Sequence, residues 1–276
     1  MTSYIARLFY LGDNYYGSQY QPGLVTVQGE LIEAMNQWSK DSHSPQTVRL
    51  SGRTDRGVHS IGQIVHIVSE RELNIDKVNR YLPADITLWA VAPAPQDFNP
   101  RFDVLFRHYR YYFGTDSSIS DVQAMRLAVQ SLCGTHDFRL FSKPDGDRPT
   151  KTTILNVCLF QIDNGLVMDI FGTNFLWKMV RKTVSLLAQI GKGTLDLNLF
   201  SNALSGKKSI VGGIRPASPE GLVLIETATS IRMTASKYAI ARIQNHLNDR
   251  QDYLQRSYQT LAAINADDFF HQRNSF

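Results

Sequence analysis

The sequence contains little cysteine and no long apolar run. Cys133 and Cys158 are the only cysteines among 276 residues, and neither has a partner at the spacing of a metal site. Both lie among apolar residues, so we expect them to be small buried side chains in a reducing compartment. No stretch approaches the roughly 18 apolar residues of a membrane span, and Arg7 and Asp13 interrupt the apolar N-terminal segment, unlike a signal peptide. These absences predict a cytoplasmic protein that does not enter membranes.

Charge of either sign is also modest. Charged residues make up 20% and hydrophobic residues 43% of the chain, which is typical of a folded globular protein and excludes the disordered and collagen-like classes. Lys and Arg number 29 against 25 Asp and Glu, giving a net charge of +4. This balance permits a polyanionic partner without requiring one. A chain of 276 residues can form one large or two ordinary domains.

Hydrophobic periodicity divides the N-terminal part of the chain into alternating elements. Residues 4–11 are rich in aromatic and β-branched residues and predict a strand followed by a turn-rich loop. Helical spacing begins after Thr26, a good N-cap, and predicts a helix to about Lys40. A strand running into residue 51, a strand over 61–69, a short helix stopped by Pro83 and a buried strand over 86–95 follow. The predicted order is β, α, β, β, α, β.

A comparable series follows in the second part of the chain. We expect a strand ending near residue 114, a helix over 120–132, strands over 153–162 and 165–171, helices over 175–190 and 195–205, and a strand over 221–229. The fold class is therefore α+β. The two series predict two subdomains of similar plan, residues 1–105 and 106–231, joined near residues 98–106 and compatible with one continuous sheet.

The last part of the chain, residues 232–276, differs in character. From Ser236 to Ile264 it has neither glycine nor proline, and it predicts a helical extension. Its apolar residues fall on one face at spacings of three, four and seven. These residues are Ile240, Ile243, Leu247, Leu254, Tyr258 and Leu261. Two interpretations stay open: an arm that serves oligomerisation or partner binding, and a helix that covers the sheet.

A dense polar cluster, SGRTDRGVH at residues 51–59, interrupts two apolar strands. Gly52 and Gly57 allow a tight loop whose main chain a ligand can approach. Asp55 lies between Arg53 and Arg56, and a neighbouring guanidinium favours the charged carboxylate. A charged carboxylate suits nucleophilic attack or substrate positioning better than general acid catalysis. Taken alone, however, the cluster favours an Arg–Asp pair that fastens a turn.

Two other segments combine basic and aromatic residues. In RFDVLFRHYRYYFG, strand geometry places Arg107, Tyr109 and Tyr111 on one face and His108, Arg110 and Tyr112 on the other. Rings beside guanidinium groups suit an unstacked base and its phosphates. In NFLWKMVRKTVSLL, helical spacing places Lys178, Arg181 and Lys182 on one face. Each segment alone is typical of an ordinary strand edge or solvated helix face, but three basic and aromatic segments together exceed that expectation.

No metal site is expected. His59 and His66 are seven residues apart in strands, which is not the spacing of a zinc site on a helix. The segment KPDGDR at residues 143–148 resembles the start of a calcium loop but lacks the further carboxylates and the terminal Glu. We therefore predict that residues 143–148 form a surface turn.

The ordered motifs resemble one family. YYGSQYQPG with TVQGELIEAM, SGRTDRGVHSIGQIVH, FNPRFDVLFRHYRYYF, GTHDF, NFLWKMVRKTVS and PEGLVLIE occur in the order and at the spacing found in the tRNA pseudouridine synthase A family. The resemblance covers about residues 4–229, and the G-R-T-D-x-G-V-H block is highly specific. It implies two α+β subdomains around a central mixed, mainly antiparallel sheet.

The resemblance also implies roles for individual residues. Asp55 corresponds to the nucleophile and Tyr109 to the tyrosine that stacks on the target uracil. Arg181 corresponds to the arginine that pairs with the catalytic carboxylate, and Arg53 to the arginine that opens the RNA and holds the flipped nucleotide. Three further residues are candidates for RNA contact: Arg56, Arg110 and Lys178.

The implied activity is isomerisation of uridine to pseudouridine in the anticodon arm of tRNA, at positions 38–40, by a homodimer without metal or cofactor. Arg56 and Ser18 depart from the common bacterial pattern and resemble archaeal relatives, and the tail lies outside the match. These departures leave the set of target uridines open. A non-catalytic tRNA-binding or folding factor, and an enzyme acting mainly on another structured RNA, are the alternatives.

Overall fold

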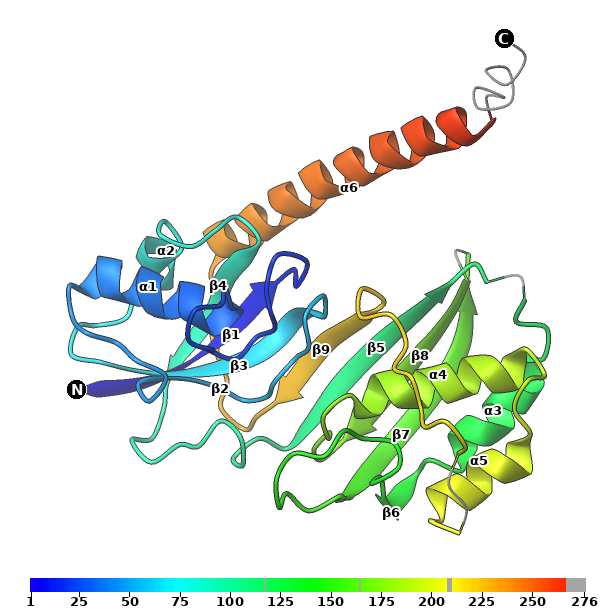
Figure 1. The fold of residues 1–276 in the computed structure, drawn as a ribbon. Helices are drawn as coiled ribbons and strands as arrows, with labels where there is room; N and C mark the ends of the chain where they lie inside the picture. The colour runs from blue at the N-terminus through cyan, green and yellow to red at the C-terminus, as the bar shows by residue number, and fades with distance from the viewer. Residues whose placement is uncertain (117, 164, 208–209, 267–276) are drawn as a thin grey trace.

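Ten strands of the computed structural model form one sheet that runs through the whole molecule (Figure 1). The structure describes residues 1–116, 118–163, 165–207 and 210–266. The strand order is β10-β4-β1-β3-β9-β5-β8-β7-β6, with β2 paired to β3 outside this path. Among the described strand pairs, β3 and β9 are the one parallel pair. The predicted mixed, mainly antiparallel α+β fold is confirmed.

The N-terminal part follows the predicted element order. Its elements are β1 (Thr2–Tyr10), α1 (Val27–Ser39), β2 (Val48–Leu50), β3 (His59–Ser69), α2 (Ile75–Val78) and β4 (Ile86–Pro93). The Thr26 side chain accepts a hydrogen bond from the Gly29 amide, and Lys40 ends α1 with a φ of 67°. This cap satisfies an amide that the first helical turn leaves free. The helices α1 and α2 pack their apolar faces on the strands around Tyr10, Leu31 and Met35.

The C-terminal part contains the expected helices and one strand that the pattern missed. Its elements are β5 (Phe106–Gly114), α3 (Val122–Gln130), β6 (Gly134–Asp137), β7 (Lys151–Ile162), β8 (Gly165–Gly172), α4 (Met179–Gly191), α5 (Leu197–Leu204) and β9 (Leu222–Ala228). The four-residue β6 is too short to show alternation. The predicted helix from residue 175 begins only at Met179, so residues 175–178 lie in the connection that approaches the seam of the molecule.

The last strand of the C-terminal part joins the two halves. β9 lies between β3 and β5, with His59 opposite Val223 and Ser60 opposite Leu224. The backbones meet closely there, because a Cβ on Gly62 would lie 2.2 Å from the carbonyl oxygen of Ile225. Separate hydrophobic clusters fill the two halves. The division at residues 105 and 231 remains a prediction.

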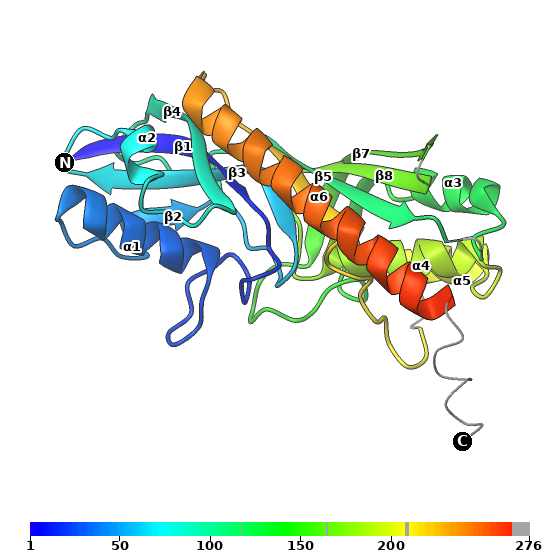
Figure 2. The ribbon, with the colours of Figure 1, turned by 90° about the horizontal axis from the view of Figure 1, so that it is seen from above.

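The tail forms a long helix that leaves the body of the molecule. After β10 (Thr234–Ala235), which pairs with β4, α6 spans Lys237–Ala266 (Figures 1 and 2). Ala239 is buried and Arg242 donates to the carbonyls of Leu82 and Pro83. Farther along the helix, Leu254 is 50% exposed and Leu261 is 66% exposed. The predicted helix is therefore present, but most of it does not cover the sheet; residues 267–276 of the predicted extension lie outside the described residues.

The expectation for the cysteines is wrong. Both Cys133 and Cys158 are free and exposed. Cys133 lies in the turn after α3, and Cys158 lies on β7 beyond an irregularity between Ile154 and Asn156. Such a shift changes which residues of a strand face the core, so apolar neighbours did not reveal the orientation of Cys158. None of the described helices combines the length and apolar character needed to cross a bilayer.

Candidate active site

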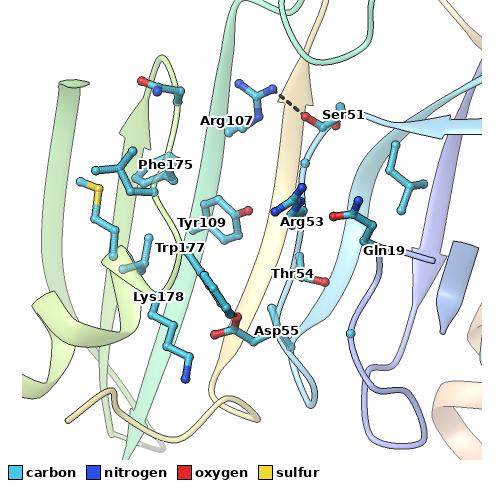
Figure 3. A pocket seen from close by; sticks show the side chains of 18 of the residues that line it. Gln19, Ser51, Arg53, Thr54, Asp55, Arg107, Tyr109, Phe175, Trp177 and Lys178 are labelled. Carbon is cyan, nitrogen blue, oxygen red and sulfur yellow. Dashed lines mark hydrogen bonds between the residues drawn. The ribbon is translucent and has the colours of Figure 1, made fainter. Parts of the chain in front are cut away.

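A cleft at the seam between the two halves gathers most of the predicted site residues (Figure 3). The loop 51–58 and the neighbouring residues 16–21 line one side. Residues 145–151 and 173–181 line the other, and β5 lies between them. The lining contains nine Lys and Arg side chains against four Asp and Glu side chains. A cleft with this excess of positive charge favours a polyanionic ligand.

Asp55 lies in this cleft with a hydrogen-bond donor on each carboxylate oxygen. Arg181 Nη1 lies 2.5 Å from Oδ2, and the indole Nε1 of Trp177 lies 3.0 Å from Oδ1. Arg181 is itself held by a bond from its Nε to the carbonyl of Ala217 at 2.7 Å. The side chains of Arg181 and Asp55 are only 13% and 17% exposed, so water screens this ion pair poorly. Asp55 comes from the N-terminal half and both donors come from the C-terminal half.

The neighbouring arginines in the sequence do not make this pair. The Arg53 side chain is 57% exposed, and its Nη1 lies 3.3 Å from Asp145. The guanidinium of Arg56 lies 4.7 Å from the ring centroid of Tyr16, a cation–π contact between two residues that line the cleft. The turn-fastening interpretation of residues 51–59 therefore does not describe Asp55, whose charged partner comes from a distant helix.

Buried hydrogen bonds hold the backbone at Thr54, the residue before Asp55. Ser18 is fully buried; its Oγ accepts from the Thr54 amide at 2.8 Å, and its amide donates to the Thr54 carbonyl at 3.1 Å. The hydroxyls of Tyr10 and Thr54 lie 2.9 Å apart. These bonds fix residue 54, so the backbone of Asp55 follows a rigid path. Ser18, noted above only as a departure from the bacterial pattern, thus supports the loop.

Gly57 adopts the kind of backbone that the predicted tight loop requires. It has a φ of +83°, and a Cβ there would lie 2.8 Å from Cγ of Pro219. Its amide donates to the Gly12 carbonyl at 3.0 Å. Gly57 is therefore needed for the left-handed backbone and for packing against Pro219, and it also lines the cleft.

Tyr109 presents its ring to the cleft from β5. It lies beside Arg107 and Asp55 in Figure 3 and packs edge-to-face on Phe175, with ring centroids 5.0 Å apart. Burial, the largest cause, raises the pKa of Tyr109 above its ordinary value. The hydroxyl therefore stays protonated at neutral pH and is unsuited to act as a base. The ring can serve as an aromatic platform.

Arg107 connects the two sides of the cleft through hydrogen bonds to backbone carbonyls. It is buried, and its Nη2 donates to the carbonyls of Ser51 at 2.8 Å and Arg101 at 3.0 Å. Its Nη1 donates to the carbonyl of Thr173 at 2.8 Å. One guanidinium thus ties the loop 51–58 to the opposite side of the cleft, which leaves few of its donors for a phosphate group.

Two of the remaining RNA-contact candidates differ in position. Arg110 faces away from the cleft and binds both oxygens of Asp169 at 2.7 Å, so the structure does not bring it to Asp55. Lys178 does line the cleft, as the residue before α4, and has a φ of 64°. Its neighbour Lys182 donates to the carbonyl of Ser142 at 2.6 Å, and burial, followed by the charge of Lys178, lowers the pKa of Lys182.

Sequence patterns missed three residues of the site. Trp177 was visible only as part of an amphipathic segment, and Lys143 and Asp145 were assigned to a surface turn. The turn is indeed partly exposed, but Asp145 faces Arg53 and Lys143 lies over the Trp177 ring. No local signal marks such contacts, because each joins residues far apart in the chain.

The described residues contain no group of three or more His, Cys, Asp or Glu side chains that could hold a metal ion. A basic cleft with exposed rings around one clamped carboxylate defines a site suited to chemistry on a nucleic acid. The family model described as tRNA pseudouridine synthase matches residues 128–228.

Curated relatives match nearly the whole chain. The tRNA pseudouridine synthase A of Methanoculleus marisnigri is 36% identical over 249 residues, which is 90% of each chain. The protein of the same name from Archaeoglobus fulgidus is 34% identical over 256 residues, covering 92% of this chain and 94% of that protein. The chain belongs to the tRNA pseudouridine synthase A family.

A solved structure titled "Crystal structure of the archaeal box H/ACA sRNP Nop10-Cbf5 complex" is a more distant match. It has a TM-score of 0.34 and 10% identity, and it covers 81% of this chain and 48% of that chain. A likeness at this level supports no argument about function.

Proposed function

We propose that this protein isomerises uridine to pseudouridine in the anticodon stem-loop of tRNA, at positions 38–40, with Asp55 as the nucleophile. The observation that carries the proposal is the Asp55 carboxylate, clamped by Arg181 and Trp177 in a basic cleft. Family membership supplies the reaction class, and the position on tRNA follows from the same resemblance. A protein that only bound tRNA would gain nothing from a carboxylate facing the phosphates.

The reaction is balanced within the substrate. The N1–C1′ bond breaks, the uracil turns, and C5 forms the new bond to C1′ while its hydrogen leaves as a proton and N1 gains one. A carboxylate can attack the sugar or the base, or stabilise positive charge at C1′. Arg181 keeps the Asp55 charge paired in a poorly hydrated position while its second bond, to Ala217, fixes the guanidinium. No oxidant or reductant enters this balance.

The target base must leave its stack before the uracil can turn. Tyr109 offers a ring on which a flipped base can stack, and a stacked base is stabilised by roughly 1–3 kcal/mol. Arg53 is exposed beside the nucleophile and can follow the displaced strand or its phosphates. Lys178 extends the positive surface on the opposite side. These basic and aromatic groups explain how the cleft can bind RNA although Asp55, the side chain held within it, is itself negatively charged.

We further infer that the protein is a cytoplasmic homodimer to which α6 contributes. Its apolar residues Ile240, Leu247, Leu254 and Leu261 recur every seven residues, the period of a left-handed helical pair. In the single chain these four side chains are 36%, 39%, 50% and 66% exposed. Packing against a second copy of the chain would remove this apolar stripe from water.

Replacing Leu247 and Leu254 by Glu should give a monomer by light scattering. A molar mass equal to that of the wild-type protein would exclude this role of α6.

Tritium release tests the activity. Transcribed tRNA carrying 5-tritiated uridine should lose tritium with the wild-type chain, because isomerisation removes the C5 hydrogen. Asp55→Ala should release none while binding tRNA normally. Transcripts with cytidine at positions 38–40 should also release none. Release from the Asp55→Ala protein would refute the nucleophile, release from the cytidine transcripts would refute the position, and binding without release by the wild type would favour a non-catalytic tRNA-binding factor.

A further inference from the structure

Trp177 contacts the one carboxylate on which the proposed function depends. Its indole Nε1 donates to Asp55 Oδ1 at 3.0 Å across 122 residues of chain. The side chain is 38% exposed, so it stands in the cleft rather than in the core. Figure 3 shows the ring directed at the Asp55 carboxylate from the segment that carries Lys178. Neither the basic character of the cleft nor the Asp55–Arg181 pair requires an indole at this position.

The indole is held from its own side of the cleft. Lys143 Nζ lies 4.0 Å from the ring centroid, and the Lys143 amide donates to the Trp177 carbonyl at 2.8 Å. Lys143 belongs to the turn 143–148, whose Asp145 also faces Arg53. The turn 143–148, which the sequence predicted to be a surface turn, therefore positions Trp177 through one backbone hydrogen bond and one cation–π contact.

The backbone after Trp177 adopts a conformation that side chains disfavour. Lys178 has a φ of 64°, and no side chain caps α4 at this position. Left-handed backbone at a residue with a side chain persists where the surrounding structure enforces it, and it concentrates at functional sites. Trp177 comes just before this residue and Arg181 lies after it in α4, and the indole of the one and the guanidinium of the other reach the same carboxylate.

Two hydrogen-bond donors restrict the Asp55 carboxylate more than one donor could. With Arg181 alone on Oδ2, the carboxylate of Asp55 could still rotate about its Cβ–Cγ bond. The second donor, on Oδ1, fixes the plane of the carboxylate. Each oxygen of an ionised carboxylate accepts more than one hydrogen bond, so Oδ1 keeps a lone pair for the substrate. Fixing a reacting group in its productive orientation raises the rate of the chemical step rather than the affinity.

We propose that Trp177 is a positioning residue that orients the Asp55 carboxylate for attack. The proposal rests on the proposed function, because it assumes that Asp55 reacts. It assigns to Trp177 an effect on the chemical step and none on tRNA affinity. In the alternative role, the Trp177 indole blocks access to Asp55 until RNA displaces the ring. The two roles predict opposite changes in rate when the indole N–H is removed.

The test is the rate of a single turnover at saturating tRNA, measured together with the tRNA dissociation constant. Trp177→Phe keeps a ring and removes the N–H, and Trp177→Gln restores an N–H donor. We expect the Phe variant to react about tenfold to a hundredfold more slowly, the range for losing a hydrogen bond to a charged group. Its dissociation constant should stay within about threefold of wild type, and the Gln variant should regain part of the rate.

Trp89→Phe is the matched control. The indole of Trp89 also donates to an acceptor, the Ile61 carbonyl at 2.8 Å, and its ring also lies against a cation, that of Arg7. Trp89 does not line the cleft, so its replacement should leave the single-turnover rate unchanged. An unchanged or faster rate in Trp177→Phe would overturn the proposal, and so would a loss expressed only in affinity or a Gln variant no better than Phe. Asp55→Asn, run in parallel, tests the proposed function separately.

Discussion

The two walls of the cleft are held in different ways. The loop 51–59 that carries Asp55 is fixed by buried groups of its own half, above all by Ser18 against both polar backbone groups of Thr54. The opposite wall, residues 145–151 and 173–181, depends more on partly exposed contacts, such as Asp145 beside Arg53 and the Trp177 ring under the neighbouring Lys143. The first wall fixes the backbone next to Asp55, and the second supplies the two donors, Trp177 and Arg181, that bind its carboxylate.

We therefore expect changes in the first wall to act mainly on the stability of the fold, and changes in the second wall to act mainly on rate or affinity. Buried backbone bonds of the first wall contribute to folding, so their loss should lower stability before it changes the chemistry. Exposed contacts of the second wall contribute little to stability. Their loss should change the rate or the affinity while the fold is kept.

Removing Arg181 should produce the largest effect on the rate. Arg181→Met leaves the Asp55 carboxylate without its charged partner and with only one of its two donors, the Trp177 indole. We expect a single-turnover rate at least about a hundredfold lower. Arg181→Lys keeps the charge but cannot bind Ala217 and Asp55 with a rigid fork, so it should recover only part of the rate. A Met variant with nearly the wild-type rate would contradict the role of this wall.

Acid should weaken the N-terminal half through His66. This residue is fully buried, and burial, followed by the charge of Arg49, lowers its pKa from 6.5 to about 4. Because Arg49 Nη2 donates to Nδ1 at 3.0 Å, the ring accepts there and donates through Nε2 to Ser3. The unfolded chain binds the extra proton between these two pKa values. Stability is therefore fully present above pH 6.5 and is lost as the pH falls toward 4.

The free energy of unfolding lost through protonation of His66 amounts to about 3 kcal/mol at most. Urea unfolding at pH 7 and pH 4.5 should show a smaller pH dependence for His66→Gln than for the wild type. His136→Gln, on β6, serves as the control. Equal pH dependence in all three proteins would show that the Arg49–His66 contact does not brace this half.

Ser18→Ala should affect stability more than rate. It leaves the buried Thr54 amide without its acceptor, which costs about 1–3 kcal/mol. The free energy of unfolding from urea titration should fall by that amount. Ser205→Ala, which removes an exposed hydroxyl bonded to the Asn202 carbonyl, should change it little. If Ser18→Ala lowered the single-turnover rate by more than about tenfold at full stability, the proposed contrast between the walls would be wrong.

Asp145→Asn should produce the smallest effect. It removes a negative charge from the cleft and releases the exposed Arg53 from a 3.3 Å contact. Exposed pairs contribute about 0–1 kcal/mol, so tRNA affinity should rise by no more than about fivefold at low salt, with the single-turnover rate unchanged. The gain should shrink as salt rises. Weaker binding by this variant would show that Asp145 supports the cleft instead.

Periodicity predicted elements where burial dictates side-chain pattern. The helix after Thr26 and the strands β1, β3, β4, β7 and β8 all have a buried face that the spacing of apolar residues reveals. The strand β6, the strand β10 and the start of α4 at Met179 escaped prediction. Short strands show too few alternations. The late start of α4 reflects the left-handed backbone of Lys178, the residue before the helix, which no sequence pattern revealed.

The site was predictable only in part. The polar cluster around Asp55 stood out by composition, but its flanking arginines were expected to hold the carboxylate and do not. The true partner, Arg181, lies 126 residues away and was assigned by family resemblance alone. Trp177 was noted only as part of a basic and aromatic segment and was given no role of its own, because a ring in an amphipathic segment is usually a packing residue. Contacts between distant segments depend on the sheet that brings β3, β9 and β5 together.

The most direct test of the account is a single-turnover measurement with Asp55→Asn. This substitution keeps the shape of the side chain and an acceptor for Trp177, while it removes the charge that Arg181 pairs with. The account predicts no pseudouridine in transcribed tRNA over many wild-type half-times, with tRNA bound as tightly as by the wild type to within about threefold. Pseudouridine formation at more than about a hundredth of the wild-type rate would contradict it.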